Sequence, residues 1–117
     1  MEPKRARQIV QQLEASDSLG DPIEAFLRLI RGRYKPDIVI MLGKGDRRFS
    51  ELRKGIPRIS DRVLARQLDA LERDGVVSRT AFAEVPPHVK YSLTPGGRTL
   101  CPILKSIWKW GNGRPSR

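Results

Sequence analysis

Apolar residues recur every three to four positions along most of the chain, the spacing that buries one face of an α-helix. This spacing predicts helices over residues 4–15, 22–31, 36–42, 60–74 and 94–111. The clearest stripes are Ile23, Phe26, Leu27 and Ile30 in the second helix, and Leu64, Leu68 and Leu71 in the fourth. A brief helix is also expected over residues 50–54, with Ser50 as its cap and Leu52 facing inward.

Only one region favours β-structure. After Gly75 the composition changes to Val, Thr, Phe and Tyr, which predicts strands over residues 76–84 and 88–93 joined at residues 85–87. The second strand alternates, with Val89, Tyr91 and Leu93 expected inward and His88, Lys90 and Ser92 outward. The first strand does not alternate cleanly, so its register stays open. Residues 47–49 read as a short extended piece.

The segment around Pro57 indicates a helix-turn-helix. Pro57 cannot continue a helix, so residues 55–59 are expected to turn, and Ser60 is a good N-cap for the helix that follows. A short helix, a tight turn and a second helix with a basic outer face form this motif, and a hairpin directly afterwards makes it winged. The expected fold class is α+β, mostly α: a winged helix-turn-helix domain with a two-stranded wing and N- and C-terminal dimerisation helices.

Length and charge narrow the function. At 117 residues the chain has room for one core, and 23 basic against 13 acidic residues give a net charge of +10. That charge favours a polyanionic partner. No run approaches the roughly 18 apolar residues that a membrane-spanning helix needs, and the N-terminus does not resemble a signal sequence, so a cytoplasmic location without membrane contact is expected. One cysteine and one histidine argue against a disulfide framework, a metal site, a cofactor and enzymatic catalysis.

The helix over residues 60–74 is predicted to enter the major groove of double-stranded DNA, with the wing over residues 77–93 on the flanking minor groove or backbone. Arginine suits guanine, glutamine suits adenine and an apolar side chain suits the thymine methyl. The expected base-reading residues are Arg62, Val63, Arg66 and Gln67. The expected backbone contacts are Lys44, Arg47, Arg48, Arg53, Arg58 and Ser60, with His88 and Lys90 from the wing.

The terminal helices carry more apolar surface than a minimal winged domain needs. An isologous homodimer would cover it, and the operator should then be a near-palindrome. The alternative is that the last helix packs fully inside its own subunit. The expected interface residues are Ile9, Leu13, Leu100, Ile103, Leu104, Ile107 and Trp108. Residues 1–20 are assigned to dimerisation, 21–111 to the winged domain and 112–117 to a basic disordered tail.

Several segments together resemble the HxlR family of bacterial transcription regulators. They lie between Pro22 and Gly111 and include residues 48–52, 59–60, 63–64 and 68–77 and, most specifically, the wing over residues 84–94. Gly97, Leu100 and Trp110 fit as well. The resemblance implies a MarR-like winged homodimer, joined through its terminal helices, that binds operator DNA as a repressor or activator. Several family members respond to electrophiles, oxidants or aldehydes.

The chain departs from that family where redox sensing is concerned. Some members sense through a cysteine just before the proline that opens the first core helix, and here that position is Asp21. The motif that follows is altered to Gly32-Arg33-Tyr34, and Lys90 stands where an acidic residue is frequent. Cys101 falls on the apolar stripe of the last helix, so we expect a packing role for it.

The sequence therefore predicts an operator-binding transcriptional regulator, expected to be a repressor. The alternative is a winged module that binds RNA, single-stranded DNA, a protein, or DNA architecturally, without operator specificity. A small-molecule effector between the dimer helices and the first core helix is left open, and no residue identifies it.

Overall fold

The computed structural model describes residues 21–114, and the chain divides into two compact units, residues 1–31 and 32–117. The first unit contributes α2 (Asp21–Leu29), on which Ile23 and Leu27 are both exposed. The predicted helix over residues 4–15, with Ile9 and Leu13, lies outside the described residues.

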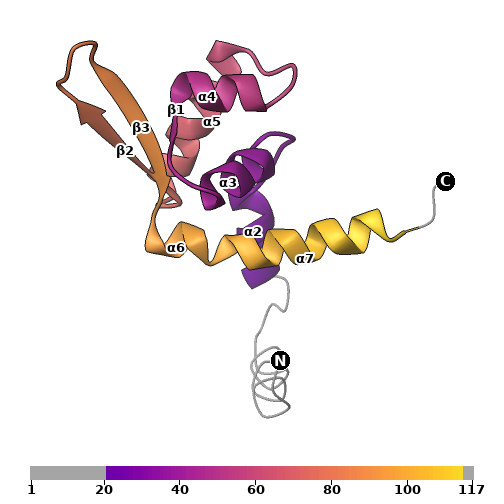
Figure 1. The fold of residues 1–117 in the computed structure, drawn as a ribbon. Coiled ribbons are helices and arrows are strands. Elements are labelled where there is room, and N and C mark those ends of the chain that lie inside the picture. Colours follow the sequence, from indigo (N-terminus) through magenta and orange to yellow (C-terminus); the bar gives the residue numbers. More distant parts are fainter. Residues whose placement is uncertain (1–20, 115–117) are drawn as a thin grey trace. The chain divides into compact units, whose positions relative to one another are not determined.

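The second unit is mostly helical with a small antiparallel sheet, which confirms the predicted fold class (Figure 1). Its elements are α3 (Lys35–Gly43), β1 (Arg47–Arg48), α4 (Phe49–Gly55), α5 (Asp61–Arg73), β2 (Val77–Phe82), β3 (His88–Leu93), α6 (Pro95–Arg98) and α7 (Leu100–Asn112). Between residues 21 and 114 no helix has the length and apolar character needed to cross a membrane.

The core of this unit forms where α3, α4 and α5 meet. The predicted stripe Leu64, Leu68 and Leu71 is fully buried, which confirms the inward face of α5. The buried side chains Ile38, Val39 and Leu42 of α3 and Leu52 of α4 belong to the same core as this leucine stripe. Each such side chain contributes roughly 1.5–3 kcal/mol of burial free energy. This packing fixes α5 relative to α4, so the opposite face of α5 is left to solvent.

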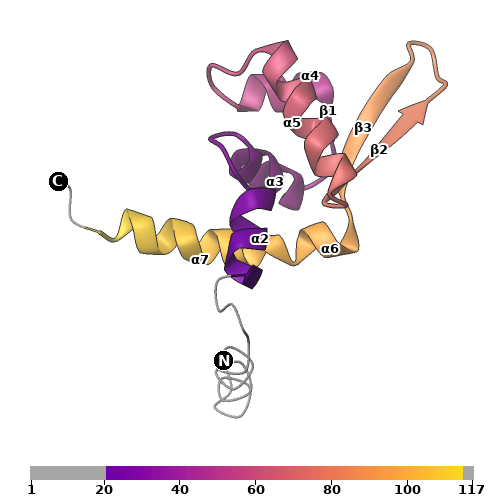
Figure 2. The ribbon, with the colours of Figure 1, turned by 180° about the vertical axis from the view of Figure 1, so that it is seen from behind.

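The sheet has three strands in the order β1-β3-β2, one more than the predicted two-stranded wing. The β2–β3 hairpin itself is confirmed, with Val77 opposite Leu93 and Phe82 opposite His88. β1 adds to the other edge of β3, where Arg47 lies opposite Tyr91. β2 ends at Phe82 rather than at residue 84, because the chain turns back before Pro86 and Pro87, which have no N–H to donate. Figures 1 and 2 show the hairpin extending away from the helices, beside the α4–α5 pair.

The start of α4 and the continuity of the C-terminal helix differ most from the sequence prediction. The expected cap of α4, Ser50, lies inside its first turn, because the helix begins at Phe49 and the backbone N–H of Arg48 donates to Glu51 Oε1 at 2.8 Å. The C-terminal helix is divided into α6 and α7 at Thr99, whose backbone N–H and hydroxyl both donate to the Gly96 carbonyl. Pro102 cannot extend the hydrogen-bond ladder across this break.

A tight joint connects the end of α5 to α6. The Thr94 hydroxyl donates to the Gly75 carbonyl at 2.5 Å and accepts the N–H of Gly97 at 2.9 Å. Gly97 is buried, and a Cβ at this position would overlap the carbonyl oxygen of Val76. Gly75, with a φ of 75°, ends α5 in the left-handed conformation as its sequence position predicts. The end of α5, the end of β3 and the start of α6 are therefore joined through Thr94 and Gly97.

Candidate nucleic-acid interface

The turn between α4 and α5 is fixed by two buried isoleucines and by a hydrogen bond from Tyr34. Ile56 and Ile59 are buried beneath it, and Pro57 and Arg58 are exposed above. Arg58 has a φ of 66°, and its carbonyl accepts a long hydrogen bond from the Tyr34 hydroxyl at 3.5 Å. Ser60 caps α5 as predicted, because its Oγ accepts the N–H of Val63 at 3.1 Å. The first turn of α5 is thus fixed where a recognition helix meets base edges.

The exposed face of α5 differs in part from the predicted base-reading set. Arg62 and Arg66 are exposed, whereas Val63 and Gln67 are half-buried beside the leucine stripe. Ala65, which is not in the predicted base-reading set, is exposed on the same face as the two arginines. The leucine spacing carries the signal for it, since the positions on the opposite side of that stripe are the ones that solvent reaches.

Arg53 does not stand free, as a dedicated phosphate contact would. Its Nε lies 3.0 Å from Oδ1 of Asp61, in the first turn of α5, and both side chains are more than half exposed. The pair therefore connects α4 to α5 across the turn. It also neutralises the carboxylate closest to the start of the recognition helix, which would otherwise repel phosphate.

The sheet brings two of the predicted backbone contacts together. Arg48 and Lys90 are direct cross-strand partners, and Thr80 lies opposite Lys90 on the other side. Neighbours in such a row lie on the same face, and like charges there repel. Neither cation forms an ion pair within residues 21–114. An anion bridging them would remove the repulsion.

The other cations near the sheet have different surroundings. Arg47 is half-buried, and its Nη1 donates to the Asp46 carbonyl at 3.0 Å. Lys44 is exposed just after α3. Arg79, which the sequence analysis missed, is exposed in β2 and shares the partner Tyr91 with Arg47. Only the strand register identifies it, and the sequence left that register open.

His88 was expected to face solvent, and this part of the prediction is wrong, whereas its contact with DNA stays a prediction. Its side chain is only 13% exposed, and its ring stacks on Phe82 with the centroids 4.9 Å apart. The two residues are direct cross-strand partners, so they meet on one face of the hairpin. His88 therefore supports the wing from below its tip. The tip itself, residues 85–87, is exposed, and Val85 is completely so.

The predicted interface stripe on α7 is divided by the structure. Leu104 is buried within its own chain and Leu100 is half-buried, so these two belong to the core. Ile103 and Ile107 are exposed by 45% and 48%, and Trp110, which is not in the predicted interface set, by 66%. Their spacing i, i+4, i+7 puts these three on one face. Trp108 lies elsewhere, at a hollow between α7 and α3.

Cys101 is half-buried, with Sγ 3.9 Å from the Val39 carbonyl oxygen. It faces Gly43 so closely that a Cβ there would lie 2.8 Å from the sulfur. This environment agrees with a packing role between α7 and α3. Across residues 21–114, no group of His, Cys, Asp or Glu side chains could hold a metal ion.

Comparison with known proteins agrees with this arrangement. Residues 29–116 match the HxlR-like helix-turn-helix family. The chain is 42% identical to the uncharacterized HTH-type transcriptional regulator YdeP of Bacillus subtilis over 107 residues, covering 92% of this chain and 84% of the relative. An uncharacterized HTH-type regulator of Methanothermobacter thermautotrophicus is 37% identical over 102 residues, covering 83% and 78%.

Solved structures of similar sequence share the fold. The redox regulator HypR in its reduced form is 42% identical with a TM-score of 0.75, covering 79% of this chain and 91% of that one. A MarR-family transcriptional regulator from Porphyromonas gingivalis is 32% identical with a TM-score of 0.77, covering 86% and 97%.

Proposed function

The chain belongs to the HxlR-like helix-turn-helix family of DNA-binding transcriptional regulators, which are not enzymes, and we propose that it binds a near-palindromic operator as a two-fold homodimer. The observation that carries the proposal is the pair Arg62 and Arg66. Both are exposed on a capped helix, and neither forms an ion pair within the described residues. Exposed arginines on such a helix suit bidentate recognition of guanine.

Phosphate contacts would hold α5 in register. Arg48 and Lys90 form one cationic row on the sheet, and Arg58 is exposed at the turn before α5. We propose that the row takes one phosphate and that Arg58 takes another, with Lys44, Arg47 and Ser60 nearby. Such contacts fix orientation and carry no base information.

Dimerisation would use the exposed face Ile103, Ile107 and Trp110 of α7. The exposed apolar residues Ile23 and Leu27 of α2 are available as well. Two copies related by a two-fold axis would present two α5 helices to half-sites about one helical turn, or roughly 34 Å, apart. A dimer bound to the operator in this way would block access to a promoter, so we propose that the protein is a repressor. We also propose that it acts in the cytoplasm, where the chromosome lies.

The test compares Arg66→Ala with Arg48→Ala on an operator and on random duplex DNA of equal length. Arg66→Ala should weaken operator binding by roughly 1–3 kcal/mol and random binding far less. Arg48→Ala should weaken both about equally and reduce the salt slope by about one. Equal losses for Arg66→Ala on both sequences would contradict base reading. A preference for single strands or structured RNA over duplex would contradict operator binding.

A further inference from the structure

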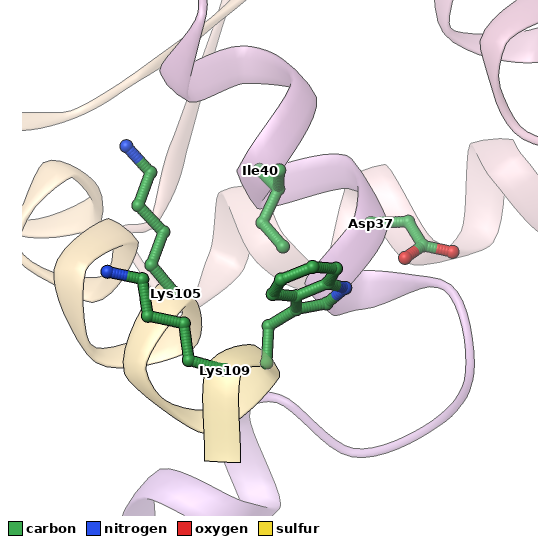
Figure 3. A pocket seen from close by; sticks show the side chains of 5 residues that line it. Asp37, Ile40, Lys105 and Lys109 are labelled. Carbon is green, nitrogen blue, oxygen red and sulfur yellow. The ribbon is translucent and has the colours of Figure 1, made fainter. Parts of the chain in front are cut away.

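A hollow of about 330 Å³ lies between α3 and α7, both in the unit of residues 32–117. It is lined by Asp37, Ile40, Lys105, Trp108 and Lys109 (Figure 3). Its volume is at the small end of the range for ligand pockets. The base-reading and phosphate-binding residues proposed above do not line it.

One wall of the hollow is cationic. Lys105 and Lys109 are four residues apart on α7, so they lie on the same face of the helix and repel each other. α7 contains no acidic residue, and neither lysine has an ion-pair partner within residues 21–114. A carboxylate or another anion between them would remove the repulsion.

The facing wall is anionic. Asp37 lies in the first turn of α3, where the helix dipole favours its charge. Figure 3 shows the lysine ammonium groups on one side of the hollow and the Asp37 carboxylate on the other, with Ile40 between them. Asp37 forms no ion pair with either lysine, so the two walls do not neutralise each other.

The middle of the hollow is apolar. Trp108 is 61% exposed there, which leaves much of its indole for a ligand to cover, and Ile40 is half-buried. Aromatic rings stack favourably on such a surface. We propose that the hollow binds a small aromatic zwitterion, with an anionic group at one end of the ring held by Lys105 and Lys109 and a cationic group at the other held by Asp37.

The same residues reach towards the helix-turn-helix. Asp37 and Ile40 also line a second hollow of about 260 Å³, whose other walls include Gly55, Ile56 and Pro57. These three residues form the end of α4 and the turn that precedes α5. A ligand that draws Asp37 towards the lysines therefore acts beside the turn that positions the recognition helix. This regulatory consequence rests on the proposed function, whereas binding of the ligand does not.

The experiment is isothermal titration calorimetry of the full chain without DNA, using three probes built on one ring. They are 4-(aminomethyl)benzoate, which carries both charges, 4-methylbenzoate, which carries only the acid, and 4-methylbenzylamine, which carries only the amine. The zwitterion should bind at least tenfold more tightly than either of the others. In Asp37→Asn the zwitterion should bind no more tightly than the acid. In the double variant Lys105→Gln with Lys109→Gln it should bind no more tightly than the amine.

Matched controls are Lys54→Gln and Asp74→Asn, exposed charges away from the hollow, which should leave all three affinities unchanged. Binding should also quench indole fluorescence, and Trp108→Phe should abolish that signal. Three equal affinities, or no heat with any probe because a second copy fills the hollow, would overturn the proposal. If the zwitterion binds but leaves operator affinity unchanged, the regulatory consequence is overturned while the ligand site stands. If the protein does not bind an operator even when no probe is present, that result counts only against the proposed function.

Discussion

Arg53 Nε lies 3.0 Å from Asp61 Oδ1, so an ion pair spans the turn between the two helices of the DNA-binding motif. Asp61→Ala removes this pair and a carboxylate at the start of α5. The free energy of unfolding should fall by about 1 kcal/mol, since exposed pairs and helix-dipole contacts each contribute a fraction of that. DNA affinity should rise, because Arg53 becomes free to meet phosphate. Urea unfolding and fluorescence anisotropy measure the two effects, and a loss of DNA affinity would show that Arg53 needs Asp61 for positioning.

Arg58 occupies left-handed backbone, with a φ of 66°. A non-glycine residue there costs roughly 1–2 kcal/mol, which glycine avoids. Arg58→Gly should therefore be more stable than Arg58→Ala by about 1 kcal/mol, while both lose the same cation. Thermal unfolding compares their stability. Equal stability of the two variants would mean that the turn relaxes in one of them. If both variants lose the same duplex affinity relative to the wild type, the loss comes from the missing cation and not from a change in backbone conformation.

Gly97 and Gly96 are adjacent and offer a matched pair. A Cβ at Gly97 overlaps the Val76 carbonyl, whereas at Gly96 the closest atom, Thr94 Oγ1, is 3.8 Å away. Gly97→Ala should reduce the free energy of unfolding by about 1–3 kcal/mol, because a backbone atom must move. Gly96→Ala should be close to neutral or slightly stabilising in the same denaturation series. Similar values for both variants would mean that α6 shifts freely.

Ile107 is 48% exposed on the α7 face that we assign to dimerisation. Ile107→Glu would bury a charge in the dimer interface and should dissociate the dimer. Light scattering should then report a 13 kDa species, and operator affinity should fall as the dimer is lost. Asn112→Glu adds the same charge at an exposed position on the opposite side of α7 and should leave the dimer intact. A wild-type chain that is already monomeric at micromolar concentration would refute the interface.

The helices of the DNA-binding motif could be predicted because each signal is local. Leu64, Leu68 and Leu71 reveal the buried face of α5, Ser60 marks its start and Gly75 its end, and the structure confirms all three. The extended conformation of β1 was expected from residues 47–49, but its place in the sheet could not be predicted, because two residues are too few to alternate. Its pairing with β3 is defined by its partner alone.

The site residues were less predictable, because their surroundings depend on contacts distant in sequence. His88 lies on the expected face of β3, but only the register with β2 places Phe82 beneath its ring. Arg53 was assigned to phosphate from its charge, and its pairing with Asp61 follows from how the turn closes. Trp108 and Ile107 are adjacent in an apolar run, and helix geometry sends them to different sides of α7.

The tip of the wing carries no charge from Val85 to Pro87, and Val85 is fully exposed. Burying such a tip against deoxyribose changes the heat capacity of association and leaves its salt dependence alone. The cationic pair below the tip, Arg48 in β1 and Lys90 in β3, acts in the opposite way. Titrations over a range of temperatures would thus report the tip, and titrations over a range of salt concentrations would report the cationic pair.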